Sequence, residues 1–144
     1  MLAFGNGGSA TDAQHLTAEL VVRFARTRRA VAAIALTADS AVLTAAANDF
    51  GVAAMFARQV EALGRPGDVA VAMTTSGQSA NVIEALKVAR AKGMSTIALT
   101  GRDGGEAGTL ADVHVNVPSE VTARIQEVHR TWIHAVCEWV EEDL

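Results

Sequence analysis

The fold is decided by the stretch "DVAVAMTTSGQSANVIEALKVARAKG", residues 68–93. It opens with a nearly continuous apolar run, passes through a loop of hydroxyl residues and one glycine, and continues at helical spacing as far as Gly93. Such a run is typical of a strand buried on both faces of a parallel sheet, and a glycine after the last helical turn is a common helix C-cap. The stretch therefore predicts a strand over Asp68–Met73, a loop, and a helix over Ser79–Lys92.

The same alternation extends in both directions. Further strands are expected at Leu2–Phe4, Ala30–Leu36, Ser95–Thr100 and Asp112–Val117. Helical spacing covers Thr11–Phe24, Ser40–Ala47, Val52–Leu63 and Ile125–Val140, whereas "GRPGD" (64–68) and "GRDGGEAG" (101–108) are typical of turns or loops. Ala30–Leu36 and Ser95–Thr100 are apolar almost throughout, so we expect them to be buried on both faces. We predict one α/β domain spanning residues 1–144, with a doubly wound, mainly parallel sheet and right-handed crossovers.

Composition narrows the class of protein. Among 144 residues there are 12 Lys and Arg against 16 Asp and Glu, so charge gives no reason to expect nucleic acid or an anionic membrane as a partner. No apolar run reaches the length of a membrane span, and no basic-then-apolar signal opens the chain. Cys137 is the single cysteine, which excludes an intrachain disulfide and fits a reducing compartment. We expect a cytoplasmic protein.

The loop "TTSGQSAN" (74–81) is the strongest candidate for a phosphate site. Thr74, Thr75, Ser76 and Ser79 supply hydroxyls, Gly77 allows the backbone to approach a ligand, and the following helix begins with free N–H groups. The loop has no lysine and no GxxxxGK[ST] pattern, which excludes a Walker-type nucleotide loop. The competing interpretation is an ordinary helix N-cap, but one hydroxyl is enough for a cap.

A second loop, "GNGGS" (Gly5–Ser9), follows the first strand. The Asn6 amide can bond sugar hydroxyls, and Gly7 and Gly8 permit a close approach. Its first four residues, "GNGG", also make a plain tight turn, and the pattern is not GxGxxG, so it indicates no dinucleotide site.

Two helices carry histidines off their apolar faces. In the first, Asp12, His15, Glu19 and Arg23 form one stripe. His15 and Glu19, at i,i+4, are either an exposed helix pair or two side chains of one site, able to bind a metal or to act as acid and base. In the last helix Gln126 and His134 lie off the apolar face, whereas His129 lies nearer to it and is expected to be structural. Spacing alone does not choose between solvent and a site walled by a neighbouring subunit.

Five blocks, taken in order, carry a family resemblance. They are "GNGGSATDAQHLTAEL", "ALTADSAVLTAAANDFG", "TTSGQSANVIEALKVARAKGM", "ALTGRDGG" and "TARIQEVHRTWIH". Together they resemble the phosphoheptose isomerases, SIS-domain proteins that interconvert sedoheptulose 7-phosphate and D-glycero-D-manno-heptose 7-phosphate through an enediol. The resemblance covers essentially the whole chain. It implies a three-layer α/β/α sandwich that assembles as a homotetramer with active sites between subunits.

The resemblance also implies roles for individual residues. Glu19 and His134 match the catalytic acid/base pair. The positions that hold zinc in zinc-containing members, one ion per subunit, are matched by His15, Glu19, Gln126 and His134. The positions implied to contact the sugar-phosphate substrate are Asn6, Gly7, Gly8, Ser9, Glu19, Asn48, Asp49, Thr74, Thr75, Ser76, Ser79 and Gln126. The first loop hydroxyl is commonly Ser in the family, and Thr74 keeps the hydroxyl.

One difference from the family pattern and one alternative function stay open. The family usually carries an N-terminal helical segment that packs in the tetramer core, and this sequence lacks it, which leaves tetramer assembly and the intersubunit sites undecided. The alternative function is non-catalytic: a SIS-domain protein that binds a sugar phosphate without turnover, or a relative of the DnaA initiator-associating proteins that binds a replication initiator. The presence of both Glu19 and His134 favours the enzyme.

Overall fold

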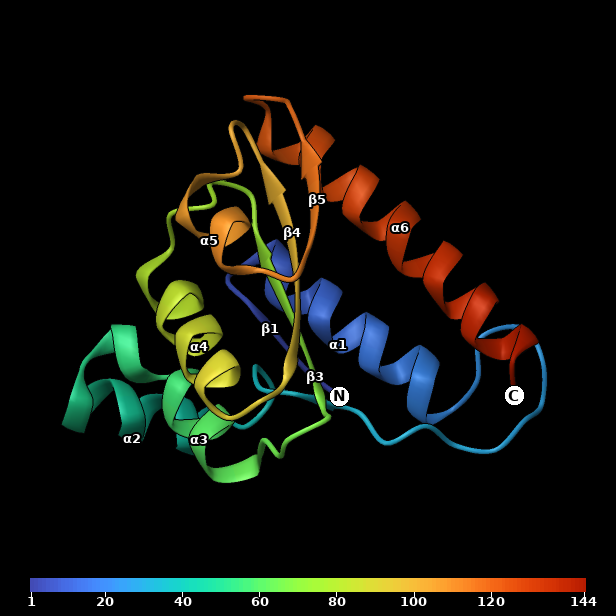
Figure 1. Cartoon of the computed structure of the whole chain (residues 1–144), viewed down its shortest axis with the longest axis horizontal. Helices are drawn as coiled ribbons and strands as arrows, with labels where there is room; N and C mark the ends of the chain where they lie inside the picture. The colour runs from blue at the N-terminus through green and yellow to red at the C-terminus, as the bar shows by residue number, and fades with distance from the viewer.

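The computed structural model describes all residues 1–144 and contains one five-stranded sheet (Figure 1). The strands are β1 (Leu2–Gly5), β2 (Ile34–Ala35), β3 (Val69–Thr74), β4 (Ser95–Gly101) and β5 (Val113–Val117). Their order is β2-β1-β3-β4-β5, and every neighbouring pair is parallel. The predicted parallel, doubly wound α/β sheet is confirmed.

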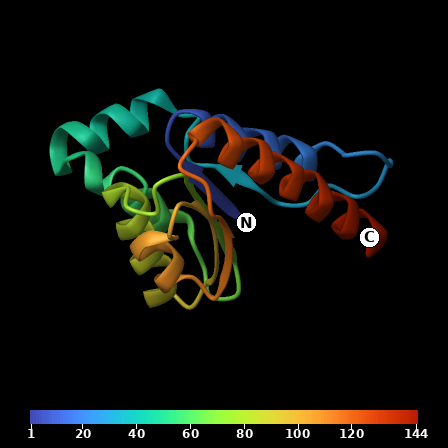
Figure 2. The same cartoon turned by 90° about the horizontal axis from the view of Figure 1, so that it is seen from above.

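Helices cover both faces of the sheet. The helices α1 (Gly8–Val21) and α6 (Thr122–Glu142) lie side by side on one face (Figures 1 and 2). The other face carries α3 (Ala57–Leu63), α4 (Ala80–Ala91) and α5 (Gly105–Leu110), with α2 (Ser40–Phe50) and a short 3-10 turn (Val52–Ala54) beside them. No helix is both long and apolar enough to cross a bilayer.

The two faces build separate cores because successive side chains of a strand point to opposite sides. On β3, Ala70 and Ala72 join the core under α3 and α4, whereas Val71 and Met73 join the core under α1 and α6. The central strands are therefore apolar in both registers, as expected of a parallel sheet covered on both faces.

The strand predicted at Ala30–Leu36 is largely wrong. Only Ile34 and Ala35 form β2, and the Ile34 side chain is 48% exposed. The run lies at the edge of the sheet and pairs with β1 alone, so one side of it has no partner strand. The apolar composition of residues 30–36 predicted a strand buried on both faces, but the position at the edge of the sheet leaves part of this run exposed.

The helix boundaries also differ from expectation. The stretch 101–108 was expected to be a loop, yet α5 begins within it, because Ala107 packs into the core and Gly104 supplies a left-handed turn at φ +89°. The first helix begins at Gly8 and ends at Val21, so Phe24 lies in the following loop. The predicted cap after α4 is confirmed, since Gly93 adopts φ +73°.

Candidate active site

The polar strand ends meet at one edge of the sheet. Gly5 at the end of β1 pairs in register with Met73 of β3, and Thr74 pairs with Thr100 of β4. This brings the loop after β1 beside the loop after β3, at the carboxyl edge where ligands bind in such sheets. A small cavity opens there, lined by Asn6, Ser9, Met73, Thr74, Thr75, Ser79 and Gln126.

The hydroxyls of the 74–79 loop form a connected cluster. Thr74 Oγ1 lies 3.3 Å from Ser76 Oγ and 3.0 Å from Ser79 Oγ, and Ser76 Oγ accepts a hydrogen bond from the Gln78 N–H at 3.1 Å. Ser79 occupies the N-cap position of α4, but its hydroxyl makes no capping hydrogen bond and turns to Thr74 instead. This geometry weakens the simple capping interpretation and leaves the hydroxyls gathered at the start of a helix, where an anion is favoured.

Gly77 has a structural role that the sequence did not indicate. It adopts φ +68°, and a Cβ there would lie 2.2 Å from the Gly104 carbonyl oxygen. The Ala107 N–H of α5 also donates to the Gly77 carbonyl at 3.0 Å. The glycine therefore allows the 74–79 loop to pack on the backbone before α5, and this contact braces the loop from behind.

A second amide holds Asn6 in place. Asn6 Nδ2 donates to Asn81 Oδ1 at 2.9 Å, and Asn81 Nδ2 donates back to Asn6 Oδ1 at 2.8 Å. Asn81 is buried in the first turn of α4, whereas Asn6 is exposed, so one amide anchors the other. Each Asn6 group keeps a further hydrogen-bonding position for a ligand. Asn81 was not among the predicted site residues, although its place at the start of α4 next to the loop marks it as a candidate.

The histidine stripes of α1 and α6 face each other across the contact between the two helices. His134 Nε2 lies 3.1 Å from His15 Nε2, which in turn lies 3.2 Å from Glu19 Oε1. All three side chains are half-buried, and the ring of Phe24 lies against His134 with centroids 5.6 Å apart. The two stripes lie off the apolar faces, as predicted, but they meet within one subunit instead of pointing only to solvent.

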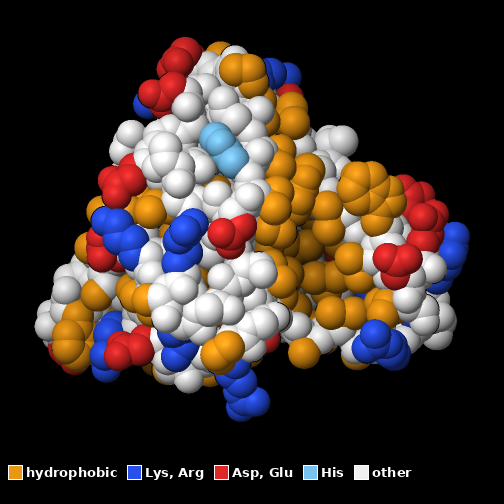
Figure 3. All heavy atoms as spheres, in the orientation of Figure 1, with side chains coloured by type: hydrophobic (Ala, Val, Ile, Leu, Met, Phe, Trp, Pro, Cys, Tyr) orange, Lys and Arg blue, Asp and Glu red, His pale blue; other side chains and the backbone are white.

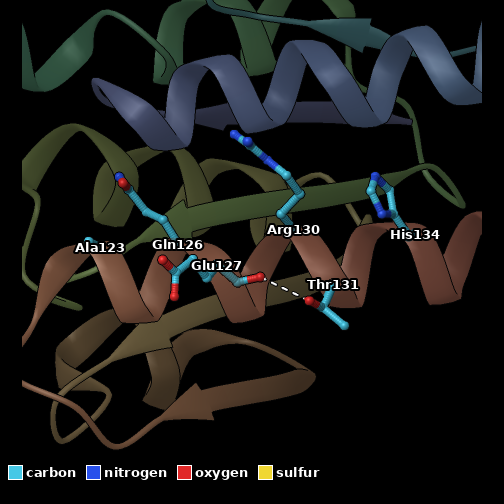
Figure 4. Close-up of a pocket in the computed structure, with 6 residues that line it drawn as sticks. All are labelled: Ala123, Gln126, Glu127, Arg130, Thr131 and His134. Carbon is cyan, nitrogen blue, oxygen red and sulfur yellow. Dashed lines mark hydrogen bonds between the residues drawn. The ribbon is translucent and has the colours of Figure 1, made fainter.

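An ion pair forms the next contact along the same helices. Arg130 donates from Nε (3.1 Å) and Nη2 (2.6 Å) to Asp12 Oδ1, and Asp12 is fully buried. Figure 4 shows Gln126, Arg130 and His134 pointing from α6 toward α1, one turn apart. Asp12 belongs to the stripe whose surroundings the sequence leaves open. Arg130 was not among the predicted site residues, although it lies four residues from both Gln126 and His134.

Gln126 connects the two parts of the site. It lines both the hydroxyl cavity and a second pocket of about 480 Å³ whose walls include Arg130 and His134 (Figure 4). A Cβ on Gly8 would lie 2.4 Å from Gln126 Nε2, so the amide rests directly on the first turn of α1. The glycine pair thus has two separate uses: Gly7 adopts φ +57° at the helix start, and Gly8 makes room for Gln126.

His129 is buried away from these groups, as expected of a structural histidine. Its side chain is fully buried and its Nε2 lies 2.9 Å from the Thr100 carbonyl oxygen, so Nε2 carries the proton and donates it. Burial lowers the pKa of the His129 imidazole, against the opposing effects of that hydrogen bond and of the Asp12 charge. The ring is therefore held in its neutral form.

The donors fit zinc in chemical type. Imidazole nitrogens and carboxylate oxygens are usual zinc ligands, and two ligands on a tetrahedral zinc lie about 3.3 Å apart. The His134–His15 and His15–Glu19 distances of 3.1 and 3.2 Å are close to that spacing. No three His, Cys, Asp or Glu side chains converge on a single point, because His15 lies between the other two.

Asn48 and Asp49 are not brought into this group. Both are exposed at the end of α2, and Asn48 Nδ2 donates to Asp49 Oδ1 at 2.8 Å. In Figure 1, α2 lies on the far side of the molecule from α6. Within one subunit their implied contact with substrate has no support.

Comparison with known proteins identifies relatives in sequence and in fold. The SIS-domain family model matches residues 1–101. The phosphoheptose isomerase of Paramagnetospirillum magneticum is 59% identical over 98% of this chain and 73% of its own length, and that of Methylibium petroleiphilum is 56% identical over 100% and 74%. A solved phosphoheptose isomerase from Neisseria gonorrhoeae is 52% identical, with a TM-score of 0.92 over 98% of this chain and 75% of that one. The family resemblance inferred from the sequence blocks is confirmed.

Proposed function

Because this chain belongs to the phosphoheptose isomerases, the aldose–ketose isomerases of the SIS-domain family, we propose that it interconverts sedoheptulose 7-phosphate and D-glycero-D-manno-heptose 7-phosphate. The observation that carries the proposal is the continuous chain from Glu19 through His15 to His134, joined by Gln126 to the hydroxyl cluster. One end of this site offers proton-transfer groups and the other offers hydroxyls at a helix start.

The reaction moves a proton between two neighbouring carbons of the sugar. A base removes the proton from the carbon beside the carbonyl while an acid protonates the carbonyl oxygen, which gives an enediol. The former carbonyl carbon then takes up a proton, and the hydroxyl on the first carbon loses its proton and becomes the new carbonyl. We assign Glu19 and His134 to these two roles. His15 contacts both partners, at 3.2 Å and 3.1 Å, and so holds the carboxylate and the imidazole at a defined separation.

The hydroxyl cluster would bind the phosphate at the non-reacting end of the sugar. Thr74, Thr75, Ser76 and Ser79 provide donors there, and the start of α4 adds its positive end. A phosphate fixed at this point restricts where the far carbons can lie, which lowers the entropic part of the barrier. Gln126 and Asn6, both placed by contacts to neighbouring elements, would bond the sugar hydroxyls between the two ends.

We also propose that one zinc ion binds per subunit, at His15, Glu19, Gln126 and His134. The support is the donor chemistry and the spacing of His15 from Glu19 and His134. Bound there, zinc would polarise the substrate carbonyl. The four side chains would need to rearrange to share one ion.

The assembly proposed is a homotetramer with sites between subunits, in which Asn48 and Asp49 reach a neighbouring copy's site. Exposed apolar side chains support association: Val113, Val128 and Trp139 are 51%, 46% and 66% exposed. Figure 3 shows apolar side chains gathered in a hollow between the sheet and α6. Light scattering of the chain measures the assembly, and a fully active monomer would contradict it. We propose a cytoplasmic location, which the buried free thiol of Cys137 suits.

The test is an isomerase assay on sedoheptulose 7-phosphate with and without a chelator. Turnover by the purified chain, lost in Glu19→Gln, supports the enzyme. Binding of the sugar phosphate without turnover supports the non-catalytic alternative and contradicts the proposal. Turnover that survives complete removal of metal, checked by metal analysis, contradicts the zinc assignment alone.

A further inference from the structure

The segment that follows α1, residues 22–33, contains no helix or strand, yet it takes part in a buried ion pair. Arg28 Nε lies 3.3 Å from Glu141 Oε1, and the two side chains are only 5% and 2% exposed. A buried pair costs desolvation and is weak evidence of a net gain in stability. The other contacts of the two side chains indicate a further role for the pair.

Glu141, at the end of α6, binds the segment through its main chain. Its carboxylate accepts N–H groups from Phe24 at 2.6 Å, Ala25 at 2.9 Å and Arg26 at 2.9 Å. Burial alone would raise the pKa of the Glu141 carboxyl, but these three hydrogen bonds and the Arg28 charge outweigh it and hold the pKa below its ordinary value. The carboxylate stays ionised and holds one defined turn of the chain.

Arg28 binds the end of α1. It donates from Nη2 to the Glu19 carbonyl at 2.6 Å and from Nη1 to the Leu20 carbonyl at 2.7 Å. The last carbonyls of a helix have no partner within it, and a cation at this end is favoured by the helix dipole. The last turn of α1 contains no basic residue, so Arg28 supplies that cation from outside.

The two residues therefore reach both members of the proposed acid/base pair. Arg28 bonds the main chain of Glu19 itself. Glu141 bonds the main chain of Phe24, whose ring packs on the His134 ring with centroids 5.6 Å apart and planes tilted by 32°. A single buried contact between α6 and the segment after α1 thus touches the backbone of one partner and the packing surface of the other.

We propose that the buried pair Arg28–Glu141, which we call the clamp, is a positioning device for catalysis. It holds the end of α1 against α6, so that the Glu19 carboxylate and the His134 ring keep their separation. Neither clamp residue touches the substrate. This inference rests on the proposed function, because Glu19 and His134 matter in it as the acid/base pair.

The test compares Glu141→Gln, Arg28→Met and Arg28→Lys in the full chain. Misplacing groups at the reaction centre lowers turnover more than binding, so Glu141→Gln and Arg28→Met should lower kcat by about ten- to a hundredfold and change KM by less than about threefold. Arg28→Lys keeps the charge near the helix end and should recover part of kcat. The matched control is Val60→Ala, which opens a cavity in the core on the opposite face of the sheet and should lower the melting temperature with kcat unchanged.

A second readout does not depend on turnover. The ring of Phe24 lies on His134, so the proton NMR signal of the His134 ring should shift in Glu141→Gln and stay in place in Val60→Ala. The signal is assigned by its loss in His134→Gln. If wild-type protein fails to turn over the sugar phosphate, the proposed function fails, whereas the NMR shift still reports the clamp. A clamp variant that loses stability like Val60→Ala but keeps both kcat and the His134 signal overturns the inference.

Discussion

The substitution Gly8→Ala adds one methyl group, and distances in the structure show how far this group would displace the Gln126 amide. The new Cβ would lie 2.4 Å from Gln126 Nε2 and 2.8 Å from both Cδ and Oε1. Ordinary contacts between such atoms are about 3.5–4.0 Å, so the amide must withdraw by about 1 Å or more. The amide is the end of a flexible side chain and can turn away, whereas the α1 backbone is held by its own hydrogen bonds.

The expected result is a loss of activity without a loss of stability. A displacement of about 1 Å at the site lowers kcat/KM by about ten- to a hundredfold. Gly8 has no left-handed φ, and alanine in a helix is favoured over glycine by up to about 1 kcal/mol, so the melting temperature should stay the same or rise. Initial rates with sedoheptulose 7-phosphate and thermal melts followed by circular dichroism measure the two effects.

Gly7→Ala, one residue away, is the comparison for stability and for the position of Gln126; it is not a control for activity, because Gly7 is itself expected to contact the substrate. A Cβ on Gly7 meets nothing within 4 Å, but the residue adopts φ +57°. Strain there costs about 1–3 kcal/mol, which lowers the melting temperature by about 3–10 °C and leaves Gln126 in place. If Gly8→Ala retains wild-type kcat/KM, the position of Gln126 does not matter to the reaction. If it melts as low as Gly7→Ala, the amide cannot move aside as argued.

Further expectations concern the proton-transfer pair, the phosphate loop and the buried histidine. Glu19→Gln and His134→Gln should each lower kcat by at least about a hundredfold. The melting temperature should change little, provided that metal analysis shows unchanged zinc. If His134→Gln retains its metal and has near wild-type kcat, His134 is not the catalytic partner of Glu19. Ser76→Ala combined with Ser79→Ala should raise KM by about tenfold or more and change kcat less, since each lost hydrogen bond to a charged group is worth about 1.5–3 kcal/mol; an unchanged KM would contradict a phosphate site in that loop. Burial lowers the pKa of His129 in the folded chain, so the unfolded chain binds the extra proton more readily. The free energy of unfolding is therefore highest above about pH 6.5, where His129 is neutral in both states, and it decreases as the pH falls below about 6.5. His129→Gln should therefore show a smaller drop in melting temperature between about pH 7 and pH 5 than the wild type, and equal drops would contradict the assignment.

The central part of the fold could be predicted because its signals are local. The runs that became β3 and β4 are apolar almost throughout, which suits strands covered on both faces, and the structure places them in the interior of a parallel sheet. Ala30–Leu36 carries the same signal and fails, because composition does not say which strand lies at the edge. The glycine-rich stretch containing α5 fails for a related reason: short helices depend on tertiary packing more than on propensity.

The candidate site also has a part that local sequence signals predict and a part that depends on tertiary packing. Loops after buried strands could be recognised from hydroxyls and glycines close together in the chain, and the family blocks added roles to Glu19 and His134. What only the tertiary structure decided is which residues far apart in sequence meet: His15 with His134, Asp12 with Arg130, and Arg28 with Glu141. Helical periodicity marks the face on which a side chain lies but not the surface packed against that face. The partner of each face, and with it the assembly of the acid/base pair, follows from the packing of α1 beside α6 on one sheet.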